Sequence, residues 1–444
     1  MKNDVSPRFS SFSLDRYYHA LNQGVVVRTG GRIKKIIGMV IEASGPASQI
    51  GSVCDILTES DRTVSAEVLG FREDSVLLMP LEDIRSLGPG CKVMARKEKA
   101  HVGVGNAMLG RIVDGLGNPI DEKGPIRIDD TYPVYANPIN PLLRSRITDP
   151  LDMGIRSING LLTVGCGQRM GIFAGSGVGK SVLLGMMARN TTAEVNVIAL
   201  IGERGRELNE FIQKDLGEEG LKKSVVVVAT SDHLPLVRLR GGFIATAVAE
   251  YFRDQGLRVN LMMDSVTRLA MAQREIGLAL GEPPTTKGYT PSVFAMLPKL
   301  LERAGTSAGR GSITGIYTVL VEGDDMNEPI ADAVRSILDG HIVLTRELAN
   351  QNHYPAIDVL KSVSRVMTDI ITDDHRLDAG RVKEVLATYR KAEDLINIGA
   401  YAKGSNPSID RAIRMIDPIN AYLKQDIHDS ASFEESVTRL AELK

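Results

Sequence analysis

The chain has 444 residues, which is enough for two or three domains with a large hydrophobic core. Its formal net charge is -2, so no strong overall field favours nucleic acid or an anionic membrane surface. Three scattered cysteines, Cys54, Cys91 and Cys166, lack metal-type spacing, and we interpret them as packing residues of a protein in a reducing compartment. The chain shows neither the apolar centre of a signal peptide nor an apolar run of membrane-spanning length. We therefore expect a cytoplasmic protein.

The N-terminal segment, residues 1–23, carries one short apolar stripe. Leu14, Tyr17, Tyr18 and Leu21 follow the i, i+3, i+4, i+7 spacing of a helix. A helix this short cannot bury its apolar face alone. It either docks on the next domain or binds a partner, and the sequence leaves both interpretations open.

The next segment, residues 24–98, consists of short β-type runs such as 36–41 and 75–79, separated by glycine and polar turns. This spacing predicts a small β-barrel. A turn-rich, proline-containing stretch then leads into residues 99–366, where strand-like runs alternate with helical patterns. The alternation predicts an α/β domain with a doubly wound, mostly parallel sheet. Residues 367–444 show helical periodicity and predict a C-terminal helical domain.

The most informative motif is the glycine-rich segment at residues 174–181, between an expected strand at 169–173 and a helix that begins near 182. Backbone N–H groups at such a strand-to-helix turn point at an anion. Ala174 stands where the strict pattern has glycine, a small departure. A chance glycine-rich turn is the alternative, but the flanking elements favour a nucleotide-phosphate loop. The predicted nucleotide-binding residues are Gly175, Ser176, Gly177, Val178, Gly179, Lys180, which would reach the β and γ phosphates, and Ser181, which would ligate Mg²⁺.

Two carboxylates follow later strands and should lie beside this loop, because the carboxyl ends of parallel strands meet at one edge. Asp264 ends an apolar strand and could hold Mg²⁺ and its waters, or could merely cap the next helix. Glu203 follows the strand at 195–201 and could orient the attacking water. The alternative for Glu203 is an ion pair with Arg204 or Arg206. Arg204 could pair with Glu203 or contact the γ-phosphate.

Two residues near position 360 complete the candidate site. Tyr354 precedes a proline and could present its ring to an adenine, although a core tyrosine is an equal alternative. Arg365 lies far from the phosphate loop in sequence. An arginine that stabilises charge on the transferring phosphoryl group raises the rate by about 10³ to 10⁵. A surface salt bridge is the alternative for Arg365.

At these residues the sequence resembles the rotary ATPase family, in particular the catalytic subunits of ATP synthases and their relatives in protein export. PAIDVLKSVS at 355–364 matches the family signature, and segments 202–204, 264–268 and 281–305 follow the family order. The resemblance implies a RecA-like central domain, ATP with Mg²⁺, and a finger arginine, Arg365, that acts in the neighbouring subunit's site. It also implies the roles given above for Lys180, Ser181, Glu203, Asp264 and Tyr354.

The resemblance also bears on assembly and partners. In ATP synthase the catalytic glutamate and the finger arginine belong to different subunit types, whereas here one chain carries both, which implies a homohexameric ring. Segments 321–344 and 389–413 resemble the flagellar and type III secretion export ATPases. Implied partners are a stator-like regulatory protein at residues 1–23, a central stalk protein in the pore, the export gate, substrates and chaperones. The resemblance also implies a cytoplasmic location, peripheral to the membrane at its inner face. It implies no specific nucleic-acid partner.

Several functions stay open at this point. ATP hydrolysis for flagellar export is the leading hypothesis, and an injectisome ATPase is the alternative. An ATP synthase catalytic subunit, a hexameric RNA translocase and a ring component that does not turn nucleotide over are further alternatives. The acidic segment of the ATP synthase β subunit is missing, which argues against direct rotary synthesis. The lack of tryptophan and the 5% aromatic content argue against a strand-binding module.

Overall fold

The computed structural model describes residues 14, 30–58, 62–321, 323 and 325–443. The chain divides into two compact units, residues 1–99 and residues 100–444. The predicted helical stripe from Leu14 to Leu21 falls, apart from Leu14, outside the described residues, so its role stays a prediction.

The first unit is a β-barrel, as the sequence predicted. Its described strands pair antiparallel in the closed order β1-β2-β5-β4-β3-β6. Alternate side chains point inward, so Ile41, Ile56 and Leu78 are fully buried together with Cys54. The strands are β1 Gly30–Ile37, β2 Val40–Ala43, β3 Ser52–Leu57, β4 Thr63–Arg72, β5 Ser75–Pro80 and β6 Lys92–Lys99.

The second unit is built on a sheet with the order β19-β18-β12-β17-β15-β13-β14-β8, and β16 pairs with β17 at one end. All neighbours are parallel except the β18–β19 and β16–β17 pairs, which confirms the predicted mostly parallel sheet. The sheet strands are β8 Arg111–Asp114, β12 Arg169–Ala174, β13 Val195–Ile201, β14 Ser224–Ala229, β15 Arg258–Asp264, β16 Gly305–Thr306, β17 Ser312–Leu320, β18 Gly340–Leu344 and β19 Val363–Ser364. Two small sheets pair β7 His101–Val104 with β9 Asp130–Pro133, and β10 Pro150–Leu151 with β11 Val164–Gly165.

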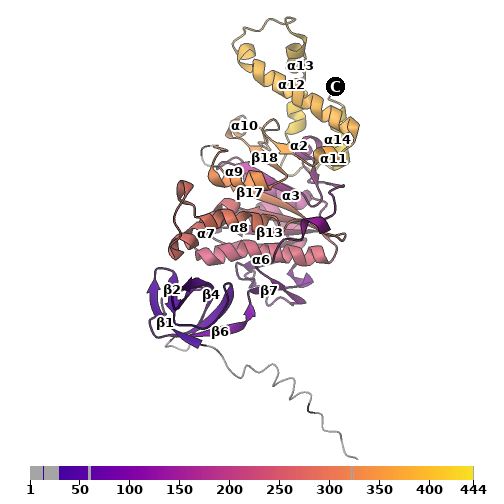
Figure 1. Ribbon diagram of the computed structural model, residues 1–444. Coiled ribbons are helices and arrows are strands. Elements are labelled where there is room, and N and C mark those ends of the chain that lie inside the picture. Colours follow the sequence, from indigo (N-terminus) through magenta and orange to yellow (C-terminus); the bar gives the residue numbers. More distant parts are fainter. Residues whose placement is uncertain (1–13, 15–29, 59–61, 322, 324, 444) are drawn as a thin grey trace, which may run out of the picture. The chain divides into compact units, whose positions relative to one another are not determined.

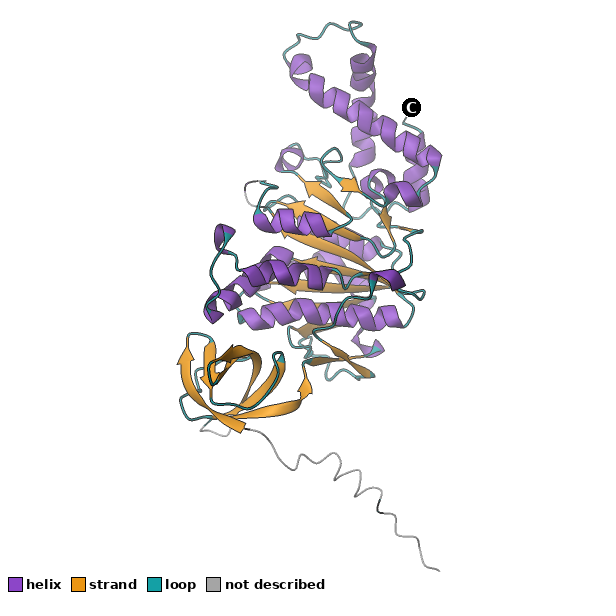
Figure 2. Cartoon of the chain, in the orientation of Figure 1, coloured by secondary structure: helices purple, strands orange, loops and turns teal. Residues whose placement is uncertain are grey.

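Helices cover both faces of this sheet (Figures 1 and 2). The buried helix α6 packs on β13, β14 and β15, and α7 packs on α6 and α8. The helices of this domain are α2 Arg156–Leu161, α3 Lys180–Asn190, α4 Gly205–Glu210, a π-helical turn Phe211–Leu216, α5 Gly217–Lys222, α6 Pro235–Asp254, α7 Val266–Leu280, α8 Pro291–Leu301, α9 Pro329–Ile337 and α10 Arg346–Asn350.

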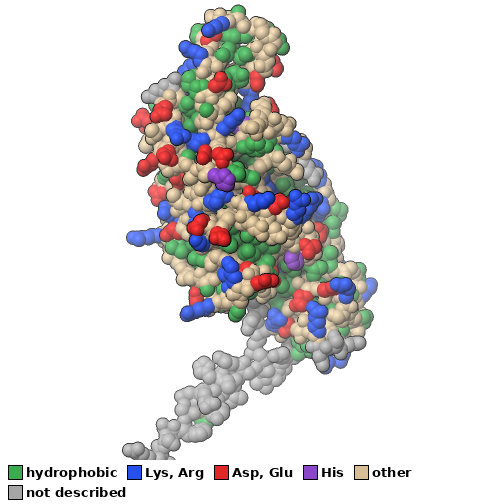
Figure 3. All heavy atoms as spheres, turned by 180° about the vertical axis from the view of Figure 1, so that it is seen from behind, with side chains coloured by type: hydrophobic (Ala, Val, Ile, Leu, Met, Phe, Trp, Pro, Cys, Tyr) green, Lys and Arg blue, Asp and Glu red, His purple; other side chains and the backbone are tan. Residues whose placement is uncertain are grey.

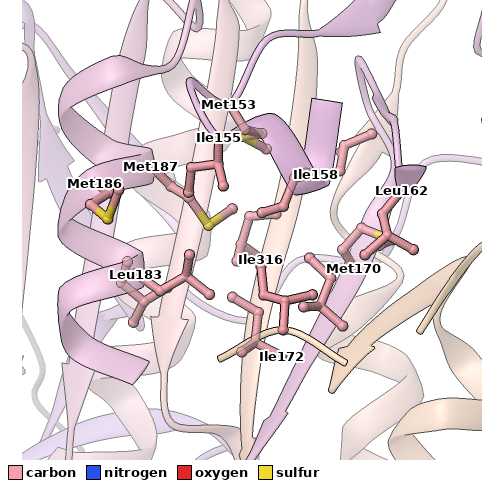
Figure 4. Close-up of a cluster of buried hydrophobic side chains, with 14 of the residues drawn as sticks. Met153, Ile155, Ile158, Leu162, Met170, Ile172, Leu183, Met186, Met187 and Ile316 are labelled. Atoms are coloured by element: carbon pink, nitrogen blue, oxygen red, sulfur yellow. The ribbon is translucent and has the colours of Figure 1, made fainter. Parts of the chain in front are cut away.

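One apolar cluster fixes the helix that follows the phosphate loop. Leu183 and Met187 of α3 meet Ile172 of β12 and Ile316 of β17 in this cluster, and Ile158 of α2 joins them (Figure 4). These side chains are at most 2% exposed. Burying each such side chain contributes about 1.5–3 kcal/mol, so the cluster holds the start of α3 at the sheet edge.

The C-terminal part is helical, as predicted, with α11 Met367–Ile370, α12 Asp373–Asn397, α13 Pro407–Leu423 and α14 Phe433–Ala441. Helices α12 and α13 pack together, and α14 packs on α2. Arg156 of α2 donates to the carbonyl oxygens of Tyr422 and Lys424, and the Tyr422 hydroxyl donates to the Arg156 carbonyl. These buried bonds dock the end of α13 beside the nucleotide-binding domain.

Two further observations concern the described helices and one face of the surface. None of the helices that the structure describes combines the length and the apolar character that a membrane crossing requires. On the face drawn in Figure 3, acidic and basic side chains of the second unit are intermingled rather than gathered into one patch of either sign.

Candidate functional site

The phosphate loop lies at the carboxyl edge of the sheet, between the end of β12 and the first residue of α3, Lys180. Gly177 and Gly179 have φ of 79° and 85°, the left-handed region that glycine adopts without strain. Ala174 is the last residue of β12 and is 1% exposed, so its methyl group packs in the core and explains why alanine fits there. Predicted loop residues Gly175, Ser176, Gly177, Gly179, Lys180 and Ser181 line a cavity of about 540 Å³, together with Glu203, Arg204, Glu207 and Arg268.

The centre of the site is an ion triplet. Lys180 Nζ contacts Asp264 Oδ1 and lies 3.6 Å from Glu203 Oε1. Asp264 ends β15, is 3% exposed, and accepts a 2.7 Å hydrogen bond from the Thr318 hydroxyl. Burial alone would lower the pKa of Lys180, but the two carboxylates outweigh it and the pKa is raised. Lys180 is therefore a firmly charged cation at the floor of the cavity.

The pKa of the Glu203 carboxyl group suits a proton acceptor near neutral pH. It follows Gly202 directly beyond β13 and is mostly buried, with a side chain 14% exposed. Burial, partly offset by Lys180, raises the pKa of Glu203 to about 7. Its Oε1 has no hydrogen-bond partner among the described residues. A carboxylate in this state can polarise a water molecule near neutral pH.

The alternative partners of Glu203 are engaged elsewhere. Arg204 has a side chain that is 80% exposed and pairs at 3.9 Å with Glu207, and Arg206 pairs with Glu210. Arg204 lines the cavity, so it is placed to meet a bound phosphate from the solvent side.

A hydroxyl and a carboxylate are available for Mg²⁺. Ser181 and Asp264 line the same small cavity next to Glu203. Both offer the oxygen ligands that Mg²⁺ prefers. Among the described residues no group of three or more His, Cys, Asp or Glu side chains could hold a metal. The residues present therefore fit an ion that takes most of its ligands from phosphate oxygens and water.

Tyr354 borders a second, apolar cavity of about 230 Å³ beside the phosphate loop. A methyl group on Gly179 would lie 3.5 Å from the Tyr354 ring, and that ring is 40% exposed. The Gln425 backbone N–H donates to the Tyr354 carbonyl at 3.0 Å. The other lining residues are Val182, Leu183, Met186, Pro355 and Ile427. An apolar slot with one aromatic wall suits a nucleobase.

Sequence reasoning missed several of the residues around these cavities, among them Arg268, Gln425 and Ile427. Arg268 lies in the first turn of α7 and lines the phosphate cavity, and its buried Nε has no hydrogen-bond partner among the described residues. The sequence feature that could have indicated Arg268 is its position four residues after Asp264. Gln425 and Ile427 line the apolar cavity from the C-terminal part, and no local pattern marks them.

Arg365 is the one predicted site residue that lies far from the phosphate loop of its own chain. It follows β19, in which Ser364 pairs with Gly340 at the amino end of β18, while the loop follows the carboxyl end of β12. The length of a strand, roughly 15–20 Å, separates the two ends. The Arg365 side chain is exposed and has no hydrogen bond or ion pair within the residues described. The Arg365 side chain is therefore out of reach of its own chain's phosphate loop.

Three family models match the chain in order. The β-barrel domain model of the ATP synthase alpha/beta family matches residues 33–96, and the nucleotide-binding domain model of that family matches residues 154–364. The model described as T3SS EscN ATPase C-terminal domain matches residues 371–442.

Curated proteins match over almost the whole chain. The flagellum-specific ATP synthase of Bacillus subtilis strain 168 is 56% identical over 415 residues, covering 93% of this chain and 94% of that protein. The protein of the same name from Salmonella typhimurium strain LT2 is 49% identical and covers 96% of each chain. The type 3 secretion system ATPase of Xanthomonas euvesicatoria is 49% identical and covers 94% of each.

Solved structures agree. The assembled ATPase EscN of the enteropathogenic Escherichia coli type III secretion system matches with a TM-score of 0.88 and 48% identity, covering 93% of this chain and 99% of EscN. EscN in complex with its central stalk EscO matches with a TM-score of 0.86 over the same shares at 48% identity. The chain is an ATPase and belongs to the ATP synthase alpha/beta family, among the flagellum-specific ATP synthases and type III secretion ATPases.

Proposed function

We propose that this ATPase hydrolyses ATP to drive protein export, in particular of flagellar axial proteins through a type III export gate. The observation that supports hydrolysis at a site shared between copies is that Glu203 and Arg365 occur in one chain but at opposite ends of the sheet. The relative of highest identity among those named above, at 56%, is flagellum-specific, and this identity supports the flagellar role. The similarity to EscN and to the Xanthomonas enzyme supports an injectisome role as the second candidate.

The chain's own residues divide the chemistry between them. The adenine lies in the apolar cavity against Tyr354, and the phosphates follow the N–H groups of residues 175–179 into the first turn of α3. Lys180 exchanges its carboxylate partners for phosphate oxygens. Ser181 and Asp264 would hold Mg²⁺, which supplies positive charge against the developing phosphate charge when it is bound.

Hydrolysis itself needs a water molecule and a further cation. Glu203 accepts a hydrogen bond from the attacking water and orients it toward the γ-phosphate. Arg204 and Arg268 neutralise phosphate charge from the cavity wall. Arg365 of a neighbouring copy completes the site and stabilises the charge on the transferring phosphoryl group.

This arrangement supports a closed ring of identical subunits, because each copy presents a phosphate loop on one side and a finger on the other. We propose that the ring is a hexamer, and the assembled state of the related EscN supports a ring of identical subunits. A central stalk protein in the pore is supported by the EscN–EscO complex. A stator-like protein at residues 1–23, the export gate, substrates and chaperones complete the proposed partners. The proposed place is the cytoplasm, at the inner face of the membrane.

A mixing experiment tests the shared site. Lys180→Ala and Arg365→Ala chains should each be inactive alone, because one lacks the phosphate lysine and the other lacks the finger. Random mixed rings restore one intact interface in four, so activity should reach about one quarter of the wild-type rate if sites act independently. No recovery at any mixing ratio would contradict the shared site.

Secretion from the source organism tests the biological role. A chromosomal Glu203→Gln change should abolish export of flagellin and shorten filaments, and Glu219→Gln serves as the matched control at an exposed carboxylate outside the phosphate cavity. Loss of effector secretion with normal filaments would instead establish the injectisome role. Normal secretion of both classes would contradict an export function.

A further inference from the structure

The amino end of β12 holds a buried hydrogen-bond network that no step above uses. Gln168 immediately precedes β12 and is 0% exposed. Its Nε2 donates to the Ser364 hydroxyl oxygen at 3.0 Å and to the Asp339 carbonyl oxygen at 3.2 Å. Its Oε1 accepts from the Gly165 N–H at 2.8 Å. Every hydrogen-bonding atom of this buried amide is therefore occupied.

The same network holds the chain at Ser364 and at the N–H of Arg365. The Ser364 hydroxyl donates to the Thr163 carbonyl oxygen at 2.8 Å, and the Arg365 N–H donates to the Asp339 carbonyl oxygen at 3.0 Å. Arg169 binds the Asp339 carboxylate through Nε and Nη2, both at 3.0 Å, and through its backbone N–H at 3.1 Å. The backbone of residues 364 and 365 is thus tied to β12, while the Arg365 guanidinium stays exposed.

We propose that Gln168, with the Ser364 hydroxyl as its contact, is a positioning residue for Arg365 in the site of the neighbouring subunit. The inference rests on the proposed ring with a finger supplied from outside. A misplacement of about 1 Å in a group that stabilises a transition state can cost about 100-fold in rate. A fully satisfied buried amide holds its partners in one arrangement, because leaving any of its atoms unpaired is costly.

Gln168 also has an alternative role, which is to position the phosphate loop of its own chain. Residues 169–174 form β12, and the phosphate loop of the same chain follows it, so a change at Gln168 could act through its own loop instead. Under the two roles, a substitution at Gln168 would impair different sides of the shared site. A finger-side defect affects the neighbour's site, and a loop-side defect affects the subunit's own site.

Mixed rings separate these roles. Gln168→Met keeps the side-chain length and removes the amide, and Ser364→Ala removes only the hydroxyl, with Ser364→Thr as the variant that retains it. Gln273→Met is the matched control, since Gln273 donates to the Ser292 hydroxyl at 3.0 Å, between α7 and α8. Each variant is measured alone for kcat and KM, and then after mixing with Lys180→Ala or with Arg365→Ala chains.

We expect Gln168→Met and Ser364→Ala to lower kcat about 10- to 100-fold with KM for ATP nearly unchanged, and Ser364→Thr to recover most of the rate. Lys180→Ala chains, which carry an intact finger, should rescue both variants, whereas Arg365→Ala chains should rescue neither. Rescue by Arg365→Ala chains alone, or by neither partner, would overturn the positioning role. The Lys180→Ala plus Arg365→Ala mixture is the reference, and its failure to recover would remove the shared site itself.

Discussion

Lys180 Nζ lies 3.6 Å from Glu203 Oε1 while it also contacts the carboxylate of Asp264. The positive charge of Lys180 thus compensates two carboxylates. We propose that Asp264 contacts the metal ion and that Glu203 contacts the attacking water. Burial outweighs this cation at Glu203, so the pKa of Glu203 rises to about 7. The carboxylate that we propose as the base is therefore poised near neutral pH.

The pH dependence of ATP hydrolysis should follow from that pKa. Since the ionised form of Glu203 is the one that polarises water, kcat/KM should rise with pH through about 7 and then level off. Steady-state rates from pH 5.5 to 8.5 measure this directly. Glu203→Gln should lower kcat by a factor of about 10³ and leave residual turnover without that rise. A wild-type profile that is flat across this range would contradict the assignment.

Folding stability should change in the opposite sense. The pKa of Glu203 is raised above its ordinary 4.5 in the folded protein, so the folded form binds a proton that the unfolded form has lost between pH 4.5 and about 7. The free energy of unfolding that Glu203 contributes is present below pH 4.5 and falls as pH rises to about 7.

Glu203→Gln should therefore match the wild type in thermal unfolding near pH 4.5 and exceed it near pH 8, both measured without nucleotide. Glu219→Gln is the control, because the Glu219 side chain is 83% exposed and lies outside the phosphate cavity. A Glu203→Gln protein that is less stable than wild type at pH 8 would show that the carboxylate stabilises the fold.

How far the sequence predicted the site depends on the range of the interactions involved. The phosphate loop, Glu203 and Asp264 follow from local patterns, because a continuous apolar run that ends at a glycine turn or a carboxylate is visible from neighbours in sequence. The apolar cavity could not be predicted, since Gln425 reaches it through bonds to Gly154 and to Arg156, about 270 residues earlier.

The position of Arg365 likewise depends on contacts between residues that are distant in sequence. The resemblance implied that Arg365 acts in a neighbouring site, but only the pairing of β19 with the amino end of β18 shows why it cannot reach its own. Strand order across a sheet depends on tertiary packing, which local propensity does not encode.

The adenine role of Tyr354 predicts a binding defect rather than a chemical one. Tyr354→Ala removes the aromatic wall of the apolar cavity, and loss of base stacking costs about 1–3 kcal/mol. The Kd for ATP should therefore rise about 5- to 150-fold, with kcat at saturation much less affected. Equilibrium titration with a fluorescent ATP analogue measures the Kd. Tyr354→Phe keeps the ring and should bind like wild type, and equal Kd values for the Ala and Phe variants would exclude stacking.

A buried ion pair far from the nucleotide site predicts a large stability effect. Arg303 has a side chain that is 0% exposed and binds Glu250 of α6 through two bonds, Nε to Oε1 at 3.0 Å and Nη2 to Oε2 at 2.6 Å. Its Nη1 donates to the Val134 carbonyl oxygen at 2.6 Å. Glu250→Ala leaves the guanidinium buried without its counter-charge, which should cost about 3–5 kcal/mol of unfolding free energy.

A double variant shows whether that cost comes from the lost attraction between the two charges or from leaving one buried charge unpaired. Glu250→Leu with Arg303→Met replaces both charges by apolar side chains of similar size, which is often neutral or stabilising. We expect the double variant to unfold at a higher urea concentration than Glu250→Ala, with an unchanged m-value. If the two proteins unfold at the same concentration, the Coulomb attraction itself stabilises the contact between α6 and the end of α8.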